Sequence, residues 1–174
     1  GVKLFVLDDF PAPVPEGDFE RIYNELGVDT ETFYRKIWWP FIRRLAQEED
    51  IRYTGAIIET YGAQVKGPFR PLGGRAARDG LIIYGRELLN MGGELGLHGY
   101  NHQPLAPAGY GQPRLNYVPW ESQADMEEAL RELRNYVKSV YPDYDFRFYV
   151  PPSNIMSPEG KAAIRKVFPE VIAF

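Results

Sequence analysis

The sequence contains no cysteine, and this absence excludes several kinds of site. Disulfides, zinc sites with thiolate ligands and cysteine nucleophiles cannot exist within a chain that lacks the residue. Histidine is also scarce, since only His98 and His102 occur among 174 residues. Any imidazole chemistry in this chain therefore depends on these two side chains.

An excess of positive charge and long apolar runs are missing as well. Lys and Arg number 20 against 24 Asp and Glu, which gives a net charge of −4. Because nucleic-acid binding depends on clustered Lys and Arg, we expect no nucleic-acid partner. No segment reaches the roughly 20 apolar residues that cross a bilayer, so we expect no membrane span in this chain.

Short apolar runs alternate with helical patterns along the chain. Strands are predicted at Val2–Leu7, Tyr53–Glu59, Glu94–Leu97 and Phe146–Val150, and a fifth begins at Glu170. Helices are predicted at Thr30–Ala46 with an interruption at Pro40, at Asp79–Met91, at Glu121–Val140, and after a Ser157 cap. This alternation predicts an α/β fold with parallel strands and outer helices.

The domain organisation is predicted to be simple. Neither a linker nor a repeat interrupts residues 1–174, so we expect a single domain. Its fifth strand begins only where the chain stops, and its first strand begins at once. We therefore expect a domain that is truncated at its C-terminal end and belongs to a larger polypeptide.

Polar residues follow the predicted strands. Asp8-Asp9 follows the first strand, and His98 follows the third. Because parallel α/β folds carry their active sites at the carboxyl ends of the strands, we expect these segments to meet at one rim. Two imidazoles and a carboxylate there favour a catalytic divalent metal.

The histidines and the acidic pair each have an alternative explanation that involves no metal. The two histidines could each be satisfied by a backbone carbonyl, and the acidic pair could open a loop or cap a helix. The metal interpretation is favoured because the only two histidines stand four residues apart, a spacing that puts both on one side of a helical turn. A first shell of this kind with an open position is typical of Zn²⁺, while Co²⁺, Ni²⁺ and Mn²⁺ are also suitable.

Three motifs together resemble a known family. Val6-Leu7-Asp8-Asp9-Phe10, His98-Gly-Tyr-Asn-His102 and a strand that ends in Pro151-Pro152 are similar to the motifs of polysaccharide deacetylases with NodB homology (carbohydrate esterase family 4, CE4). The resemblance implies a deformed or incomplete (β/α) barrel and a metal held by Asp-His-His. It also implies removal of N- or O-acetyl groups from an acetylated polysaccharide outside the cytoplasm, in the periplasm, at the cell surface or after secretion.

The resemblance assigns roles to individual residues. Asp8 matches the catalytic base, and Asp9, His98 and His102 match the metal ligands. The family's arginine, which holds the catalytic aspartate, is replaced by Tyr149, and Arg147 either substitutes for it from the same face of the strand or is a surface residue.

The resemblance is incomplete at the general acid, because the family uses a third histidine that this chain lacks. Either the chain ends before that motif, another group protonates the leaving group, or the domain is inactive.

Candidate substrate residues lie in the loops of the expected rim. The loop from Gly99 to Trp120 carries Tyr100, Tyr110 and Tyr117, whose flat rings suit sugars or else pack the loop onto the body. Pro151, Pro152 and Asn154 line the rim or serve only a turn. We therefore expect a metal-dependent polysaccharide deacetylase.

Two other functions stay open. The first is a different metal hydrolase on a similar barrel, such as an amidohydrolase or a phosphoesterase. The second is a catalytically impaired, deacetylase-like module that binds glycan or acts as a scaffold in an exopolysaccharide system.

Overall fold

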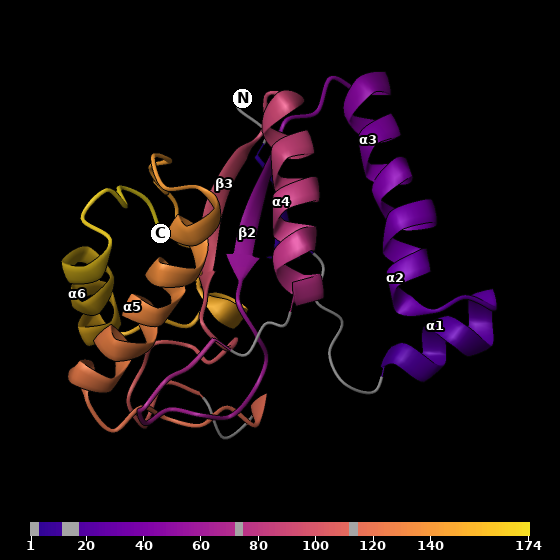
Figure 1. Cartoon of the computed structure of the whole chain (residues 1–174). Coiled ribbons are helices and arrows are strands. Elements are labelled where there is room, and N and C mark those ends of the chain that lie inside the picture. The colour runs from indigo at the N-terminus through magenta and orange to yellow at the C-terminus, as the bar shows by residue number, and fades with distance from the viewer. Residues whose placement is uncertain (1–3, 12–17, 72–74, 112–114) are drawn as a thin grey trace.

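The computed structural model describes residues 4–11, 18–71, 75–111 and 115–174. Three parallel strands form its sheet in the order β1 (Phe5–Phe10), β2 (Tyr53–Ile58) and β3 (Glu94–Gly99). Every residue of the central strand β2 is buried, as expected for a parallel strand that is covered on both faces. The predicted α/β class with a parallel sheet is therefore confirmed (Figure 1).

The predicted fourth and fifth strands are much shorter than expected. Tyr149 forms an isolated parallel bridge with Leu97 of β3, and Phe148 forms another with Ala173. Backbone hydrogen bonds accompany these bridges, so both segments continue the sheet beyond β3 without becoming regular strands. Within the described residues the sheet stays open, and a closed barrel is not formed.

An arm of helices follows β1. It consists of α1 (Asp18–Leu26), α2 (Thr30–Phe33), the π-helical turn η1 (Tyr34–Trp38) and α3 (Trp39–Glu48). Pro40 lies in the first turn of α3, directly after the π-helical turn, so the helix changes type at the predicted place. The cap of α2 is Asp29 rather than a threonine, and α1 was not predicted.

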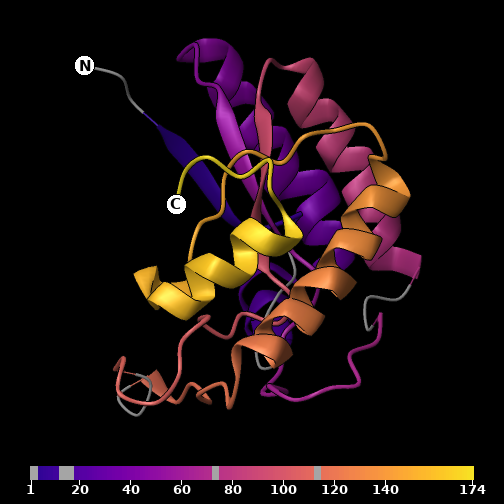
Figure 2. The ribbon, with the colours of Figure 1, turned by 90° about the vertical axis from the view of Figure 1, so that its left-hand side faces the viewer.

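The remaining helices agree with the sequence pattern. They are α4 (Arg75–Asn90), α5 (Gln123–Val140) and α6 (Pro158–Val167), with a short 3₁₀ turn η3 (Pro152–Asn154) before α6. Ser157 caps α6 by accepting a hydrogen bond from the N–H of Gly160, as predicted. Helices α5 and α6 pack against each other and lie nearest the viewer in Figure 2.

The core lies between the sheet and these helices. Its fully buried members come from all parts of the chain and include Phe10, Ile57, Leu81, Leu97, Leu133, Phe146 and Phe168. In the described part of the chain, no helix is long and apolar enough to cross a membrane.

Candidate metal centre

Asp9 reaches the centre through a bulge in β1. Leu7 pairs with Gly55 but Phe10 pairs with Ile57, so Asp8 and Asp9 on β1 face one residue on β2 and β1 carries one extra residue at this point. Asp9 adopts a positive φ of 55° there. Bulges often lie beside active sites because they change where a side chain points. The acidic pair therefore lies within β1 instead of after it.

The two histidines come from β3 and the turn that follows it. His98 is 2% exposed, and its Nδ1 lies 2.7 Å from the carbonyl oxygen of Val150. Because this Nδ1 donates to a carbonyl, the lone pair of Nε2 stays available for a ligand. His102 lies in the bend that follows β3, where Gly99 has a φ of 114° and His102 itself a φ of 60°. The helical turn expected between the histidines is wrong, since β3 and a bend bring them together.

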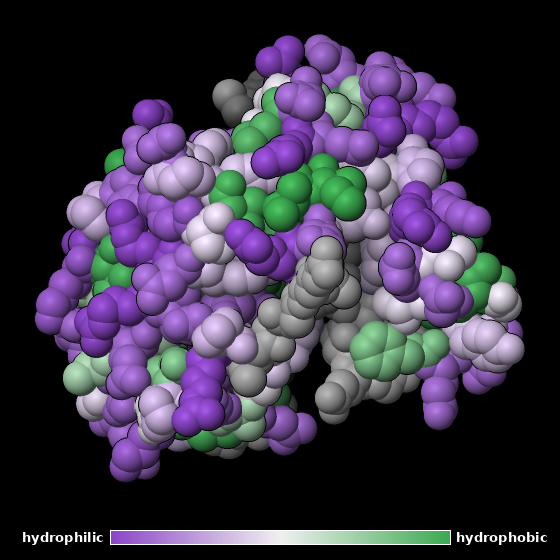
Figure 3. Space-filling model, viewed as in Figure 1, coloured by the Kyte–Doolittle hydropathy of each residue, from purple (hydrophilic) through white to green (hydrophobic). Residues whose placement is uncertain are grey.

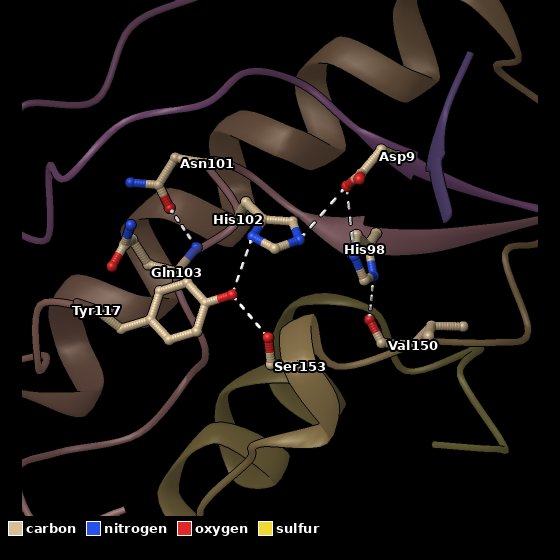
Figure 4. Close-up of polar contacts among 8 residues, drawn as sticks. All are labelled: Asp9, His98, Asn101, His102, Gln103, Tyr117, Val150 and Ser153. Carbon is tan, nitrogen blue, oxygen red and sulfur yellow. Dashed lines mark hydrogen bonds and ion pairs between the residues drawn. The ribbon is translucent and has the colours of Figure 1, made fainter. Parts of the chain in front are cut away.

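Asp9, His98 and His102 converge on one point. The Nε2 atoms of both histidines lie 3.5 Å from Asp9 Oδ1, and the two imidazole rings lie 5.0 Å apart (Figure 4). Ligands at ~2.0–2.1 Å from one tetrahedral ion are separated by roughly 3.3–3.4 Å. Asp9 Oδ1 is buried and has no hydrogen-bond partner, as a metal-ligating oxygen needs. The donor set therefore fits a divalent cation.

The electrostatics of the centre favour a neutral His102. Burial and the neighbouring His98 lower its pKa, and the carboxylates Asp9 and Asp8 only partly oppose them. A neutral imidazole offers the lone pair that a metal needs. Asp8 directly precedes the ligand candidate Asp9 on β1 and is exposed, and its charge acts on His102.

Two tyrosines complete the surroundings of His102. The ring of Tyr61 lies 5.4 Å from the His102 ring, and burial together with Asp9 raises the pKa of its hydroxyl. The hydroxyl of Tyr117 lies 3.4 Å from His102 Nδ1 and 2.7 Å from Ser153 Oγ. Sequence reasoning missed Tyr61, because no pattern marks a loop residue that reaches the site through long-range packing.

Arg147 lies far from its expected role. It is exposed, and its charge acts on Glu94 at the start of β3, whereas His98 lies near the other end of that strand. Strand alternation predicts the face of a sheet but not the end toward which a long side chain turns. Tyr149, which stands where the family has its arginine, is 1% exposed, and its hydroxyl has no hydrogen-bond partner.

The candidate substrate residues differ in exposure. Tyr100 is 3% exposed, donates its hydroxyl to the carbonyl of Arg70 and packs edge-on against Phe69, so its contacts are those of a packing residue. Tyr110 is 39% exposed. Pro152 is buried, Pro151 is half-buried, and Asn154 is exposed with a φ of 58°. The last three follow the segment that accepts the His98 hydrogen bond, close to the centre.

Comparisons with known proteins identify a family and a fold. Residues 1–173 match the family described as "Uncharacterised protein conserved in bacteria (DUF2194)", and the chain belongs to that family. No protein of curated function matches the chain.

The chain is similar in structure to a CE4 family pseudoenzyme from Bacillus anthracis, with a TM-score of 0.52 and 12% identity over 78% of this chain. A mutant of that pseudoenzyme, described as having restored enzymatic activity, matches with a TM-score of 0.51 at the same identity and coverage. The chain spans only 37–38% of the length of these structures. At this identity the likeness shows the fold alone, which is a distant relative of the CE4 fold.

Proposed function

We propose that this member of the DUF2194 family is part of a metal-dependent hydrolase that removes acetyl groups from a polysaccharide. One observation carries the proposal, namely the convergence of Asp9, His98 and His102 at ligand distances on a CE4-like fold. The acetyl linkage is either an amide or an ester. From the resemblance to the CE4 deacetylases we also propose that the substrate is an acetylated polysaccharide outside the cytoplasm.

In this proposal some residues of the chain hold the cation and another accepts a proton. Asp9, His98 and His102 would hold the cation, and Zn²⁺ fits this ligand set best. When bound, such an ion acidifies a water molecule and polarises an acyl oxygen. Asp8 is exposed and directly precedes Asp9 on β1, so we assign its carboxylate to accept the proton of an attacking water.

The residues around the centre orient it. Val150 holds the ring of His98 through its carbonyl, and Tyr117 contacts the outer nitrogen of His102. The ring of Tyr61 packs against the His102 ring at an interplanar angle of 35°. Such support fixes the ring orientations before a substrate arrives.

Hydrolysis of an acetylated probe tests the proposal. The purified chain, loaded with zinc, should release acetate from an aryl acetate or an acetylated chito-oligosaccharide. His98→Ala should abolish turnover together with metal binding, whereas Asp8→Asn should abolish turnover and retain the metal. A rate that survives in both variants would contradict the proposal.

A second candidate is a catalytically impaired module that binds glycan. Two observations favour it: Arg147 acts on Glu94 instead of Asp8, and both histidines of the chain belong to the metal cluster, which leaves no imidazole for a general acid. This module would bind zinc and an acetylated oligosaccharide without releasing acetate. The same assay therefore separates the two candidates.

A further inference from the structure

A cavity lies outside the metal cluster. It has a volume of about 700 Å³ and lies between the α2–η1 part of the helical arm, α4 and the end of β2. In Figure 1 the arm and α4 lie side by side, and Trp39 of α3 contacts Tyr84 of α4 at 5.2 Å between ring centroids. None of the three metal-cluster residues is among its described lining residues.

Two buried polar side chains with few hydrogen-bond partners line this cavity. Glu59 is 3% exposed, and neither of its carboxyl oxygens accepts a hydrogen bond from an N–H or O–H group of the described residues, while its protonated form shares a hydrogen bond with the carboxyl of Glu132. The hydroxyl of Tyr136, which is 7% exposed, has no hydrogen-bond partner among the described residues. An unsatisfied buried polar group costs ~1–3 kcal/mol, so a ligand that donates hydrogen bonds to an ionised Glu59 and contacts the Tyr136 hydroxyl would be stabilised here.

The charges of the described lining residues favour a cation over an anion. Among these residues, Glu31, Glu59 and Asp79 line the cavity together with the guanidinium of Arg35, which lies 3.8 Å from Glu31. Burial, and then the neighbouring Glu132, raises the pKa of Glu59 to about 8. The unliganded carboxyl is therefore mostly protonated at neutral pH, and a positive ligand is the partner that would stabilise its ionised form.

Aromatic and apolar groups form the rest of the wall. Tyr34, Tyr84 and Tyr136 line the cavity, and aromatic rings attract cations to their faces. Ile83 of α4 is 54% exposed and lines the cavity as well. Figure 3 shows hydrophobic side chains gathered over α4 on a surface that is otherwise mostly hydrophilic. A ligand with an apolar body is favoured by these contacts.

We propose that this cavity binds a small organic ammonium, a primary amine on a compact apolar body, with its charged group between Glu59 and Tyr136. The ammonium donates hydrogen bonds to the Glu59 carboxylate, and the Tyr136 hydroxyl donates to the same carboxylate or is turned toward the ligand. The proton that Glu59 carries before binding leaves to the buffer. This inference does not depend on the deacetylase proposal.

Calorimetric titration with a matched pair of probes tests the inference. Cyclohexylmethylamine and cyclohexylmethanol have almost the same shape, and only the amine is charged. At pH 7 we expect the amine to bind at least about tenfold more tightly than the alcohol. Titrations in two buffers of different protonation enthalpy should report the release of close to one proton per amine bound.

Variants locate the site. Glu59→Gln keeps the shape of a side chain that is uncharged before binding, so it should fold, lose at least about tenfold in amine affinity and abolish proton release. Tyr136→Phe should weaken the amine by a smaller factor. Glu159→Gln, an exposed glutamate on α6, is the control and should bind as the wild type does. His98→Ala should also retain amine binding, which separates this cavity from the metal centre.

The inference is wrong if the alcohol binds as tightly as the amine, or if neither binds up to about 10 mM. Unchanged amine affinity in Glu59→Gln would overturn it too. If Glu59→Gln does not fold, the amine–alcohol comparison in the wild type and the affinity of Tyr136→Phe decide the question.

Discussion

At the scale of the residue, a few atoms determine what the centre can hold. The Nδ1 of His98 is committed to the Val150 carbonyl, so Nε2 is the atom that faces Asp9. Parallel strands bring their carboxyl ends to one edge, which is why sequence alone could place Asp9 near His98. Tyr61 and the Val150 carbonyl could not be predicted, since their positions depend on loops that no periodicity describes.

Loss of one imidazole should remove the metal site. His98→Ala should weaken Zn²⁺ binding by more than about 100-fold, because two of three ligands remain and a buried carboxylate loses its neighbour. Competition with a chromogenic chelator measures this affinity. Asp8→Asn is the control, since Asp8 is outside the ligand cluster, and equal zinc affinities in the two variants would contradict the assignment.

Tyr117 should affect the metal only indirectly. Its hydroxyl contacts His102 Nδ1 at a long 3.4 Å, so Tyr117→Phe should weaken Zn²⁺ binding by about tenfold, at the lower end for residues that orient a ligand. Ser153→Ala, which removes the other partner of the Tyr117 hydroxyl, should have a smaller effect in the same titration. A larger loss in Ser153→Ala than in Tyr117→Phe would show that Tyr117 does not act through His102.

Glu59 should make stability depend on pH. Burial and the Glu132 charge raise its pKa from 4.5 to about 8, so between these values the folded chain holds a proton that the unfolded chain has lost. The free energy of unfolding therefore decreases as the pH rises through this range, by on the order of a few kcal/mol, and the full contribution is present only below the unfolded pKa.

Glu59→Gln isolates this contribution. The amide does not titrate, so the variant should lose less stability than the wild type between about pH 5 and pH 8. Urea unfolding at both pH values measures the difference. Identical pH dependence in the two proteins would show that Glu59 does not carry this proton.

At the scale of the element, local signals predicted helices better than strands. Ser157 followed by Pro158 predicted the start of α6, because capping and proline preference act within a few residues. The segment at 146–150 has an apolar strand pattern, yet it makes only bridges to Leu97 and Ala173. Strand formation depends on partners that are distant in sequence, so an apolar run alone does not determine its length.

Two serine caps offer a matched comparison. Ser157 is fully buried and donates to the Leu105 carbonyl in addition to capping α6, while Ser122 caps α5 at an exposed position. We expect Ser157→Ala to lower the free energy of unfolding by about 2 kcal/mol and Ser122→Ala by about 1 kcal/mol. Chemical denaturation of both variants measures these values, and a reversed order would contradict the buried hydrogen bond.

At the scale of the whole molecule, the metal cluster connects distant parts of the chain. Asp9 belongs to β1, whereas His98 and His102 belong to β3 and the following turn. The parallel sheet and the shared edge followed from the alternating pattern, whereas the order of the strands within the sheet was not predicted. The openness of the sheet did not follow from the pattern either, because residues 170–174 look like a strand but pair only at Ala173.

Zinc should therefore stabilise the whole fold. At a free zinc concentration of 100 times the dissociation constant, binding adds about 2.7 kcal/mol to the free energy of unfolding. For a chain of this size that corresponds to a rise in Tm of roughly 5–10 °C. Thermal unfolding with and without zinc measures the rise, and it should vanish in His98→Ala. A similar rise in that variant would place the bound zinc elsewhere.

The irregular step in β1 also makes the centre vulnerable to a particular kind of genetic change. Loss of a single codon at position 8 would let β1 continue its ladder with β2 without interruption, so the folded protein would survive and could even gain hydrogen bonds. The remaining aspartate would then point to the side of the sheet that strand alternation gives it. It would either face away from the imidazoles or reach them without a second carboxylate beside it. In relatives that carry this bulge, we expect loss of the metal cluster to arise through small deletions in the first strand as well as through replacement of a histidine.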